Sequence, residues 1–391
     1  MTVLTYAIGT LALIVLVPSL VFLVECVASL FPLRPRVEEL PPSATTVVLV
    51  PAHDESASIG GTVAALKGEL GKGDRLVVVA DNCTDDTAER ATAAGATAIR
   101  RQDPKHRGKG YALRFGVEWL ESNPPTVVVV VDADCRLQPG SIHLLAAQAL
   151  ALGRPVQAEY TFVPPTRTPL SMVSMLALLV RNRVRPRGLR RLGLPCQLTG
   201  SGMAFPWVLL RDAPPLRSHL VEDLLLGIEL ARAGAPPFHS IEAQVTSELP
   251  TSTSAAMQQR KRWEHGQLGT LLRQGPRLVL AGFSRLDLGL VALGADLMVP
   301  PLALLVGLSV LTTGAAAALV MAEGSVLPLW FASAALTAVA IAVGLAWVRY
   351  GRKSVPFRYL LVAPLYLLWK IPLYLSFSLG RRERRWRRTE R

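Results

Sequence analysis

One stretch of this chain constrains its fold more than any other: a run of five valines, 127–131, followed at once by Asp132-Ala133-Asp134. An unbroken run of β-branched residues is typical of a strand buried on both faces, as in a parallel sheet. Two carboxylates at alternate positions then point the same way from the strand end. Because open α/β sheets bind ligands at the carboxyl ends of their strands, these aspartates are candidates to hold a divalent metal and a phosphate. A polar strand-end turn is the alternative.

Strand and helix patterns alternate around this run. Short apolar strands are expected at 46–50, at 76–80 and near Ala98, each followed by a helical pattern. This order predicts an α/β fold with a mostly parallel sheet and right-handed crossovers. The first two strands also lead into acids, Glu55 and Asp81, so acids from three strands are expected to line one crevice. No glycine-rich dinucleotide motif or P-loop follows the strands, which argues against those chemistries.

Long apolar segments flank the α/β part of the chain. Half of the residues are hydrophobic and the mean hydropathy is +0.34, which is too apolar for an ordinary soluble protein. Residues 6–31 are expected to form a retained transmembrane helix, because no basic start or cleavage site marks a signal peptide. Residues 301–321 and 328–348 are each long enough to span, whereas 286–299 is too short. Segment 357–379 contains charges and prolines, so we expect it to be re-entrant or interfacial, with a fourth span as the alternative.

The charge distribution favours a membrane over nucleic acid as the partner. The net charge is +13, and much of the excess lies beside apolar segments and in the C-terminal tail. That pattern is typical of positive-inside flanking and of attraction to anionic lipid. We therefore predict a multi-pass protein of the cytoplasmic membrane with its α/β domain in the cytoplasm, where Cys83 and Cys135 stay reduced, and we expect no disulfides among the four cysteines. The predicted parts are a transmembrane helix (1–33), a proline-rich linker (34–44), a catalytic domain (45–275), interfacial and transmembrane helices (276–380) and a basic cytoplasmic tail (381–391).

Three further motifs follow the expected sheet. The segment 199–205 is a glycine-rich turn, and such turns let the backbone approach a ligand closely. Glu222 and Asp223 open a helical pattern, where the helix dipole favours ionised carboxylates. Residues 259–263, Gln-Arg-Lys-Arg-Trp, lie on an amphipathic helix that leads toward an apolar segment. The alternatives are acids placed only for the helix dipole and a basic interfacial helix with a tryptophan anchor.

In this order, the motifs resemble those of the membrane-embedded family 2 glycosyltransferases, the group that contains cellulose, hyaluronan, chitin and poly-N-acetylglucosamine synthases. The resemblance covers about residues 45–270 and implies a GT-A fold with α-helical transmembrane segments. The matching motifs are the first-strand motif (Pro51 to Glu55), the nucleotide-binding Asp81, the G-K-x-x-A-L motif around Lys109, the D-x-D (Asp132-Ala133-Asp134), the E/T-D base motif (Glu222-Asp223) and the Q-x-x-R-W motif (Gln259 to Trp263). The second-strand motif departs from the family pattern, because Ala80 stands where the family often has its first acid.

The resemblance implies a role for each motif. Asp223 would be the general base, and Glu222 would orient its loop. The residues expected to bind the nucleotide-sugar are Glu55, Asp81, Lys109 and Asp132, with Asp81 contacting uracil. Asp134, together with Asp132, would hold Mg²⁺ or Mn²⁺. The residues expected at the acceptor or the diphosphate are Gly200, Ser201, Gly202, Gln259, Arg262 and Trp263.

The implied activity is inverting, metal-dependent transfer from a UDP-sugar to a membrane-proximal glycan, in poly- or oligosaccharide synthesis at the cell surface. Export or accessory subunits are the expected partners besides the bilayer, and no nucleic acid is expected. The small number of spans leaves single transfer to a lipid acceptor, such as a polyprenyl phosphate or a glycolipid, as an alternative. A membrane scaffold with a degenerate nucleotide-sugar domain is the non-enzymatic alternative.

Overall fold

The computed structural model of the chain describes residues 2–164, 166–214, 221–250, 252–323 and 325–380. The predicted basic tail, 381–391, lies outside the described residues. The chain divides into two compact units, one of helices (1–33, 166–194 and 267–383) and one built on a sheet (34–165, 195–266 and 384–391). Residues 166–194, which fall inside the predicted range 45–275, group with the helical unit.

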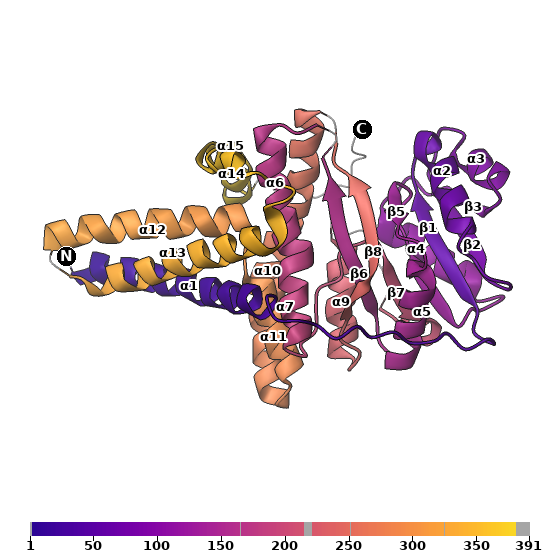
Figure 1. The fold of residues 1–391 in the computed structure, drawn as a ribbon, viewed down its shortest axis with the longest axis horizontal. Helices are drawn as coiled ribbons and strands as arrows, with labels where there is room; N and C mark the ends of the chain where they lie inside the picture. Colours follow the sequence, from indigo (N-terminus) through magenta and orange to yellow (C-terminus); the bar gives the residue numbers. More distant parts are fainter. Residues whose placement is uncertain (1, 165, 215–220, 251, 324, 381–391) are drawn as a thin grey trace. The chain divides into compact units, whose positions relative to one another are not determined.

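An eight-stranded sheet forms the second unit, in the order β3-β2-β1-β4-β7-β6-β8-β5 (Figure 1). Its strands are β1 (Thr46–Ala52), β2 (Arg75–Asp81), β3 (Thr97–Arg101), β4 (Val127–Val130), β5 (Cys135–Leu137), β6 (Val156–Val163), β7 (Met203–Pro206) and β8 (Phe238–Glu248). The first four in this order run parallel, as the alternating pattern predicts. However, β7 is antiparallel to both β4 and β6, and β5 is antiparallel to β8, so the sheet is mixed. The valine run indicates burial on both faces, and burial does not determine the direction of a neighbouring strand.

Helices cover both faces of the sheet because its central strands alternate their side chains with a period of two. On one face, Val48 and Val129 pack into a buried cluster with Ile59 of α2 (Ser56–Lys67) and Ile142 of α5 (Ser141–Leu152). On the other face, Val128 joins a cluster with α4 (Lys109–Leu120) and α9 (Glu222–Arg232). The shorter α3 (Thr87–Ala93) and α8 (Trp207–Arg211) complete the helices of this unit. The sheet is therefore a rigid platform, and polar residues gather at its carboxyl edge.

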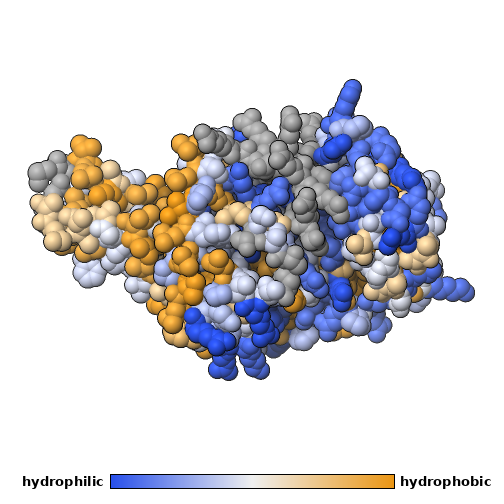
Figure 2. All heavy atoms as spheres, turned by 90° about the horizontal axis from the view of Figure 1, so that it is seen from above, coloured by the Kyte–Doolittle hydropathy of each residue, from blue (hydrophilic) through white to orange (hydrophobic). Residues whose placement is uncertain are grey.

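The helical unit contains three helices that are long and apolar enough to cross a membrane. These are Val3–Ala28 within α1 (Thr2–Ala28), Leu302–Ala322 within α12 (Leu302–Glu323) and Leu327–Gly351 across α13 (Leu327–Ala346) and η2 (Trp347–Gly351). In Figure 2 the visible surface of these helices is largely hydrophobic. The remaining helices are α6 (Pro169–Leu179), η1 (Val180–Val184), α7 (Arg185–Arg191), α10 (Thr253–Arg285), α11 (Leu288–Met298), α14 (Phe357–Leu360) and α15 (Ala363–Ser378). With 16 residues, α15 is not among the three candidates, so the re-entrant segment stays a prediction.

A buried charge cluster connects α7 to α1 and α11 in the helical unit. The Arg185 guanidinium donates to Glu25 at 2.6 Å and to the Asp296 carboxylate at 2.5 Å, and all three residues are at most 6% exposed. Charges removed from water are tolerated only when they are paired and hydrogen-bonded. Glu25, an acid that interrupts the apolar run 6–31, is therefore accounted for by a partner far away in the sequence.

Two mid-helix glycines test how closely α4 packs against the sheet. A Cβ on Gly116 of α4 would lie 2.7 Å from Leu49 Cδ1 of β1, whereas a Cβ on Gly60 of α2 meets nothing within 4 Å. We expect Gly116→Ala to lower the free energy of unfolding by about 1–2 kcal/mol, because overpacking costs about 1–3 kcal/mol and exceeds the gain in helix propensity. The control Gly60→Ala should be neutral or stabilising by about 0.5–1 kcal/mol. Thermal or denaturant unfolding measures both, and equal effects would contradict the close packing of α4.

Candidate active site

A pocket opens at the carboxyl edge of the sheet, where β1, β2 and β4 end. It is lined by Pro51, Ala52, His53, Glu55, Asp81, Gly108, Lys109, Ala112, Asp132, Ala133, Asp134, Gln259 and Arg262. The parallel direction of these three strands brings their acids together, as the sequence predicts. The helix α4 supplies Lys109 from its first position, and α10 supplies Gln259 and Arg262. Residues as far apart in the sequence as Pro51 and Arg262 thus share one cavity.

The two aspartates of the D-x-D motif follow the valine strand directly. Their carboxylate oxygens and the Cys135 sulfur all lie within 4.8 Å of one another. The Asp132 backbone N–H donates to Ser201 Oγ at 3.1 Å, and Ser247 Oγ lies 3.4 Å from Asp134 Oδ2. The turn is thus attached to two other strand regions, and its two carboxylates are close enough to share one divalent cation.

The ammonium group of Lys109 lies at the back of this turn. Its Nζ donates to Asp132 Oδ1 and, at 2.5 Å, to the backbone carbonyl of Gly200. Burial alone would lower the pKa of Lys109, but the negative charges of Asp132 and Glu222 outweigh it and raise the pKa above its usual value. Lys109 is therefore a charged group that neutralises several carboxylates at once.

The glycine-rich turn, 199–205, packs closely against the residues of the site. Gly200 has a φ of +97°, and a Cβ there would lie 3.1 Å from Asp223 Oδ2 and 3.5 Å from Lys109 Nζ. Gly202 has a φ of +67°, and its Cβ would come within 2.8 Å of Ala158 Cβ. Ser201 is 0% exposed and holds the Asp132 backbone. Among the described residues, none of these three belongs to the pocket lining, so they shape the site through their neighbours.

The acids Glu222 and Asp223 occupy the first turn of α9. Burial, and then the adjacent negative charge of Asp223, raise the pKa of Glu222 from its ordinary 4.5 to about 7. The Asp223 carboxylate lies beside Gly200, the residue whose carbonyl accepts from Lys109. Neither acid is part of the described lining, so the structure brings them next to the pocket rather than into it.

The Q-x-x-R-W motif is divided between two environments. Gln259, 5% exposed, and Arg262 both line the pocket. Burial lowers the pKa of Arg262, while the charges of Glu222 and Asp132 act to raise it. Trp263 instead lies with its ring centroid 5.7 Å from that of Phe162 on β6 and does not appear in the described lining. The one-turn spacing on a helix predicts that Gln259 and Trp263 face the same site, but in the structure Gln259 lines the pocket with Arg262, whereas the Trp263 ring packs against Phe162.

Glu55 stands at the N-cap position of α2, at the rim of the pocket. Its Oε2 accepts from Ser58 Oγ at 2.9 Å, and its backbone N–H donates to Thr87 Oγ1 at 2.8 Å. These contacts attach the end of β1 to the start of α3. Glu55 therefore lines the pocket, as the sequence predicts. Its contacts with Ser58 and Thr87 stabilise the local backbone at the edge of the pocket.

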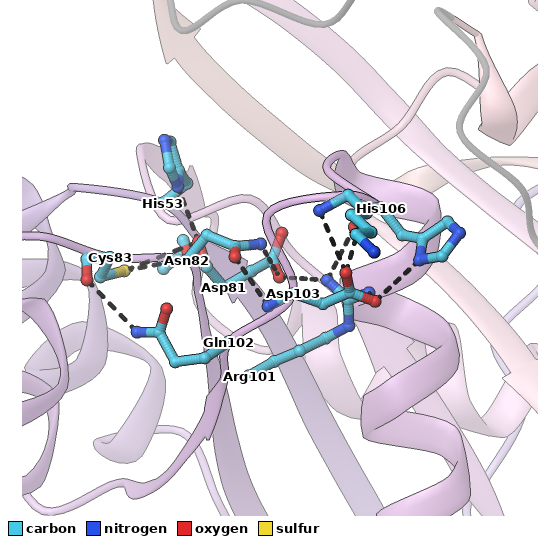
Figure 3. Close-up of polar contacts among 10 residues, drawn as sticks. His53, Asp81, Asn82, Cys83, Arg101, Gln102, Asp103 and His106 are labelled. Atoms are coloured by element: carbon cyan, nitrogen blue, oxygen red, sulfur yellow. Dashed lines mark hydrogen bonds and ion pairs between the residues drawn. The ribbon is translucent and has the colours of Figure 1, made fainter.

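Asp81 has partners that the sequence motifs do not reveal (Figure 3). Arg101 Nη1 donates to Asp81 Oδ1 at 2.6 Å, Asn82 Nδ2 donates to the same oxygen at 2.9 Å, and His53 Nδ1 donates to the Asp81 carbonyl at 2.6 Å. Burial raises the pKa of Asp81, and the hydrogen bond from Arg101 opposes that rise. In the sequence, Arg101 could have been recognised as a partner of Asp81 because it ends the strand that follows β2, at the same edge of the sheet as the acids.

Comparisons with known proteins agree with this geometry. The model of the family described as "Glycosyltransferase like family 2" matches residues 41–266. A glucosyl-3-phosphoglycerate synthase of Mycolicibacterium paratuberculosis is 37% identical over 98 residues, which are 23% of this chain and 28% of that protein. A glycosyltransferase of Mycobacterium tuberculosis is 37% identical over 105 residues, 27% of this chain and 43% of the relative. The aligned parts thus span less than half of the length of these relatives.

A solved structure extends the similarity of fold to nearly the whole chain. The mannosyltransferase from Pyrobaculum calidifontis, determined in complex with GDP-Man and Mn²⁺, superposes with a TM-score of 0.55 at 15% identity. The superposition covers 95% of this chain and 99% of that one, which indicates a shared GT-A architecture. Because the family match contains every strand of the sheet and every residue of the pocket, this chain belongs to glycosyltransferase-like family 2.

Proposed function

We propose that this protein is an inverting glycosyltransferase that transfers a sugar from a nucleoside diphosphate sugar, with a UDP-sugar as the donor. The observation that carries the proposal is the shared pocket, which combines Asp81, Lys109, Arg262 and the two aspartates of the D-x-D motif. A pocket with two cations and several carboxylates suits a ligand that has a base at one end and a diphosphate in the middle. The relatives named above are glycosyltransferases or are named for glucosyl transfer, which agrees with this class of reaction.

The donor is proposed to lie with its diphosphate beside the cations of the pocket and its base beside Asp81. Lys109 and Arg262 offer donors to the diphosphate, and Arg262 has the planar fork that suits bidentate contact with phosphate. Asp81 lies across the pocket at the end of β2, where its carboxylate can accept a hydrogen bond from the nucleobase. Glu55 closes the rim on the same side. This placement directs the sugar toward Asp223 and Gly200.

The D-x-D residues fit a divalent metal. Asp132 and Asp134 present carboxylate oxygens close to each other, and hard oxygen ligands suit Mg²⁺ or Mn²⁺. The Pyrobaculum mannosyltransferase, which shares the fold, was determined with Mn²⁺. When bound, the metal would stabilise the negative charge that develops on the leaving diphosphate. Asp132 and Asp134 would hold the metal, while Lys109 and Arg262 would contact the diphosphate, and Ser201 and Ser247 position the turn that carries both acids.

Asp223 is the proposed general base. Its carboxylate lies beside Gly200 and interacts electrostatically with the Lys109 ammonium. As the base it accepts the proton of an acceptor hydroxyl as the oxygen attacks the anomeric carbon and the nucleoside diphosphate leaves. Inversion is what the resemblance to the family implies, and it corresponds to a direct displacement in which Asp223 is the base while the carboxylates of the lining bind the metal and the nucleotide. Glu222, the neighbouring acid in the first turn of α9, is proposed to orient that turn rather than to act as the base.

The acceptor is proposed to be a membrane-proximal glycan. Support comes from the three helices that are apolar enough to span a bilayer and from the helix α10, which contains Gln259 and Arg262 and continues to Arg285. Synthesis of a polysaccharide by a synthase of the cellulose and chitin type is the finer form of this proposal. One relative is named for a small phosphorylated product, glucosyl-3-phosphoglycerate, so single transfer to a small or lipid-linked acceptor is the second candidate.

Replacement of the base tests the chemical step. We expect Asp223→Asn to lower kcat by about 10²–10⁴-fold while UDP affinity stays within about twofold, because the base contacts the acceptor rather than the nucleotide. UDP release from the donor and equilibrium UDP binding measure the two quantities. Glu229→Gln on the same helix, whose partner is Arg232, is the matched control and should leave both unchanged. Near-normal turnover of the Asp223→Asn variant would refute its role.

Replacement of a D-x-D acid tests the metal site. Asp134→Asn should weaken binding of Mn²⁺ in the presence of UDP by at least about tenfold, because it removes one of two hard oxygen ligands. Electron paramagnetic resonance of free and bound Mn²⁺ measures this directly. The control Asp86→Asn removes an exposed acid that pairs with Arg90 and should leave Mn²⁺ affinity unchanged. Equal Mn²⁺ affinity in Asp134→Asn and wild type would exclude Asp134 as a ligand.

The raised pKa of Glu222 predicts a dependence of stability on pH. The pKa of Glu222 rises from 4.5 in the unfolded chain to about 7 in the folded state, because the folded site disfavours the ionised carboxylate. The contribution of Glu222 to the free energy of unfolding is therefore fully present below pH 4.5 and is lost as the pH rises through 7. Glu222→Gln removes the titration, so the variant should be more stable than wild type by about 1–3 kcal/mol at pH 8.5 and similar to it at pH 5. Unfolding with EDTA present measures this difference. A variant that is less stable at pH 8.5 contradicts the expectation.

A further inference from the structure

Arg101 is the last residue of β3, and it connects two parts of the pocket that the sequence motifs treat separately. The parallel pairing of β2 and β3 puts Asp81 opposite Arg101 in register. The guanidinium is 11% exposed and donates through Nη1 to Asp81 Oδ1 at 2.6 Å and to the His106 carbonyl at 2.9 Å. Its Nη2 donates to Asp103 Oδ2 at 3.2 Å. One side chain thus binds the acid at the end of β2 and the loop that follows β3.

Asn82 completes the connection beside Asp81. It has a φ of +52°, a conformation that asparagine tolerates better than most residues. Its Nδ2 donates to Asp81 Oδ1 at 2.9 Å, and its Oδ1 accepts from the Asp103 backbone N–H at 2.8 Å. The donors from Arg101 and Asn82 therefore meet at the same oxygen of Asp81, and the dashed lines of Figure 3 converge there. The backbone N–H of Gly108, the residue before Lys109, also acts on the Asp81 carboxylate as a hydrogen-bond donor.

The loop bound by Arg101 leads directly into the lysine of the pocket. Asp103 Oδ1 accepts from the backbone N–H groups of Lys105 and His106 at 3.1 and 3.2 Å, which makes this segment a compact turn. The Arg101 guanidinium also lies 5.4 Å from the ring centroid of Tyr111, in the first turn of α4. Gly108, with a φ of +131°, then starts the helix with Lys109 at its first position. The position of Lys109 thus depends on a turn that Arg101 holds.

We propose that Arg101 is a positioning residue that couples recognition of the nucleobase to recognition of the diphosphate, an inference that rests on the proposed function. It orients the Asp81 carboxylate, which lines the pocket, to accept from a base with a ring N–H, such as uracil or guanine. It also holds the turn that carries Lys109 to the diphosphate. Arg101 itself contacts neither the reacting atoms nor the transferred sugar.

This geometry favours one class of nucleobase. A carboxylate oxygen accepts the ring N–H of uracil or guanine, whereas the corresponding ring nitrogens of cytosine and adenine are lone-pair acceptors and face it with like polarity. A site built for a hydrogen bond rejects an analogue that cannot form it, because its own polar group is left unpaired. The wild-type protein should therefore bind UDP at least about 30-fold more tightly than CDP.

Three variants on β3 test the coupling. Arg101→Met keeps the aliphatic stem and removes the guanidinium, Arg101→Lys keeps the charge and removes the planar fork, and Arg100→Met is the matched control. Arg100 is the adjacent residue on the same strand, is exposed and pairs with Glu89 at the surface. The measurements are the dissociation constants of UDP and CDP by calorimetry, and the KM and kcat for the donor. Circular dichroism and thermal unfolding of each variant show that it is folded.

We expect Arg101→Met to weaken UDP binding by about tenfold or more, to reduce the preference for UDP over CDP and to raise KM more than it lowers kcat. Arg101→Lys should lose selectivity to a similar degree despite its charge, and Arg100→Met should behave as wild type. If Arg101→Met fails to fold, Arg101→Lys carries the test alone. Folded Arg101 variants that keep the preference for UDP would overturn the inference but not the proposed function. A wild-type protein that binds neither UDP nor GDP would refute the proposed function itself.

Discussion

The rest of the site depends on the interactions of the Lys109 ammonium group with the surrounding carboxylates and with the Gly200 carbonyl. Asp132, Glu222 and Asp223 bring like charges toward one small region, and such charges repel strongly where water is scarce. Lys109 neutralises them and also binds the carbonyl of Gly200. The D-x-D turn, the glycine-rich turn and the first turn of α9 are thereby connected through one cation. Its own position is determined by the loop between β3 and α4, which Arg101 connects to Asp81.

The sheet makes this convergence possible. Strands β3, β2, β1 and β4 run parallel, so their carboxyl ends form one edge of the sheet. The polar residues at these strand ends therefore lie close together. The core beneath is a run of valine and leucine side chains that alternate between two helical layers. Glycine at positions 200 and 202 allows the neighbouring backbone to come close, since a Cβ at either position would crowd Asp223 or Ala158. The apolar core therefore fixes the positions of the strands, and the charged residues at the carboxyl edge of the sheet line the pocket.

The sequence predicted much of this site, and its errors have specific causes. Asp81, Asp132 and Asp134 were recognisable because each follows a strand whose apolar pattern is local. The strand β7 was not predicted, because it begins inside the expected glycine-rich turn 199–205, and its antiparallel pairing with β4 depends on tertiary contacts rather than on a local pattern. Gln259 and Arg262 line the pocket, whereas Trp263, which its spacing on the helix groups with Gln259, packs against Phe162, a contact between segments far apart in the sequence.

The amino-acid sequence by itself determined the alternation of strands and helices, the apolar helices and the order of the motifs, because these features depend on periodicity and on neighbouring residues. Only the tertiary structure decided which charges meet. Arg101 looks like one basic residue among several, yet the register of β2 and β3 places it opposite Asp81. Glu25 looks like an interruption in an apolar helix, yet it pairs with Arg185. Both pairings join distant segments, and the energy of a buried charge depends on its partners in space rather than on its neighbours in the chain.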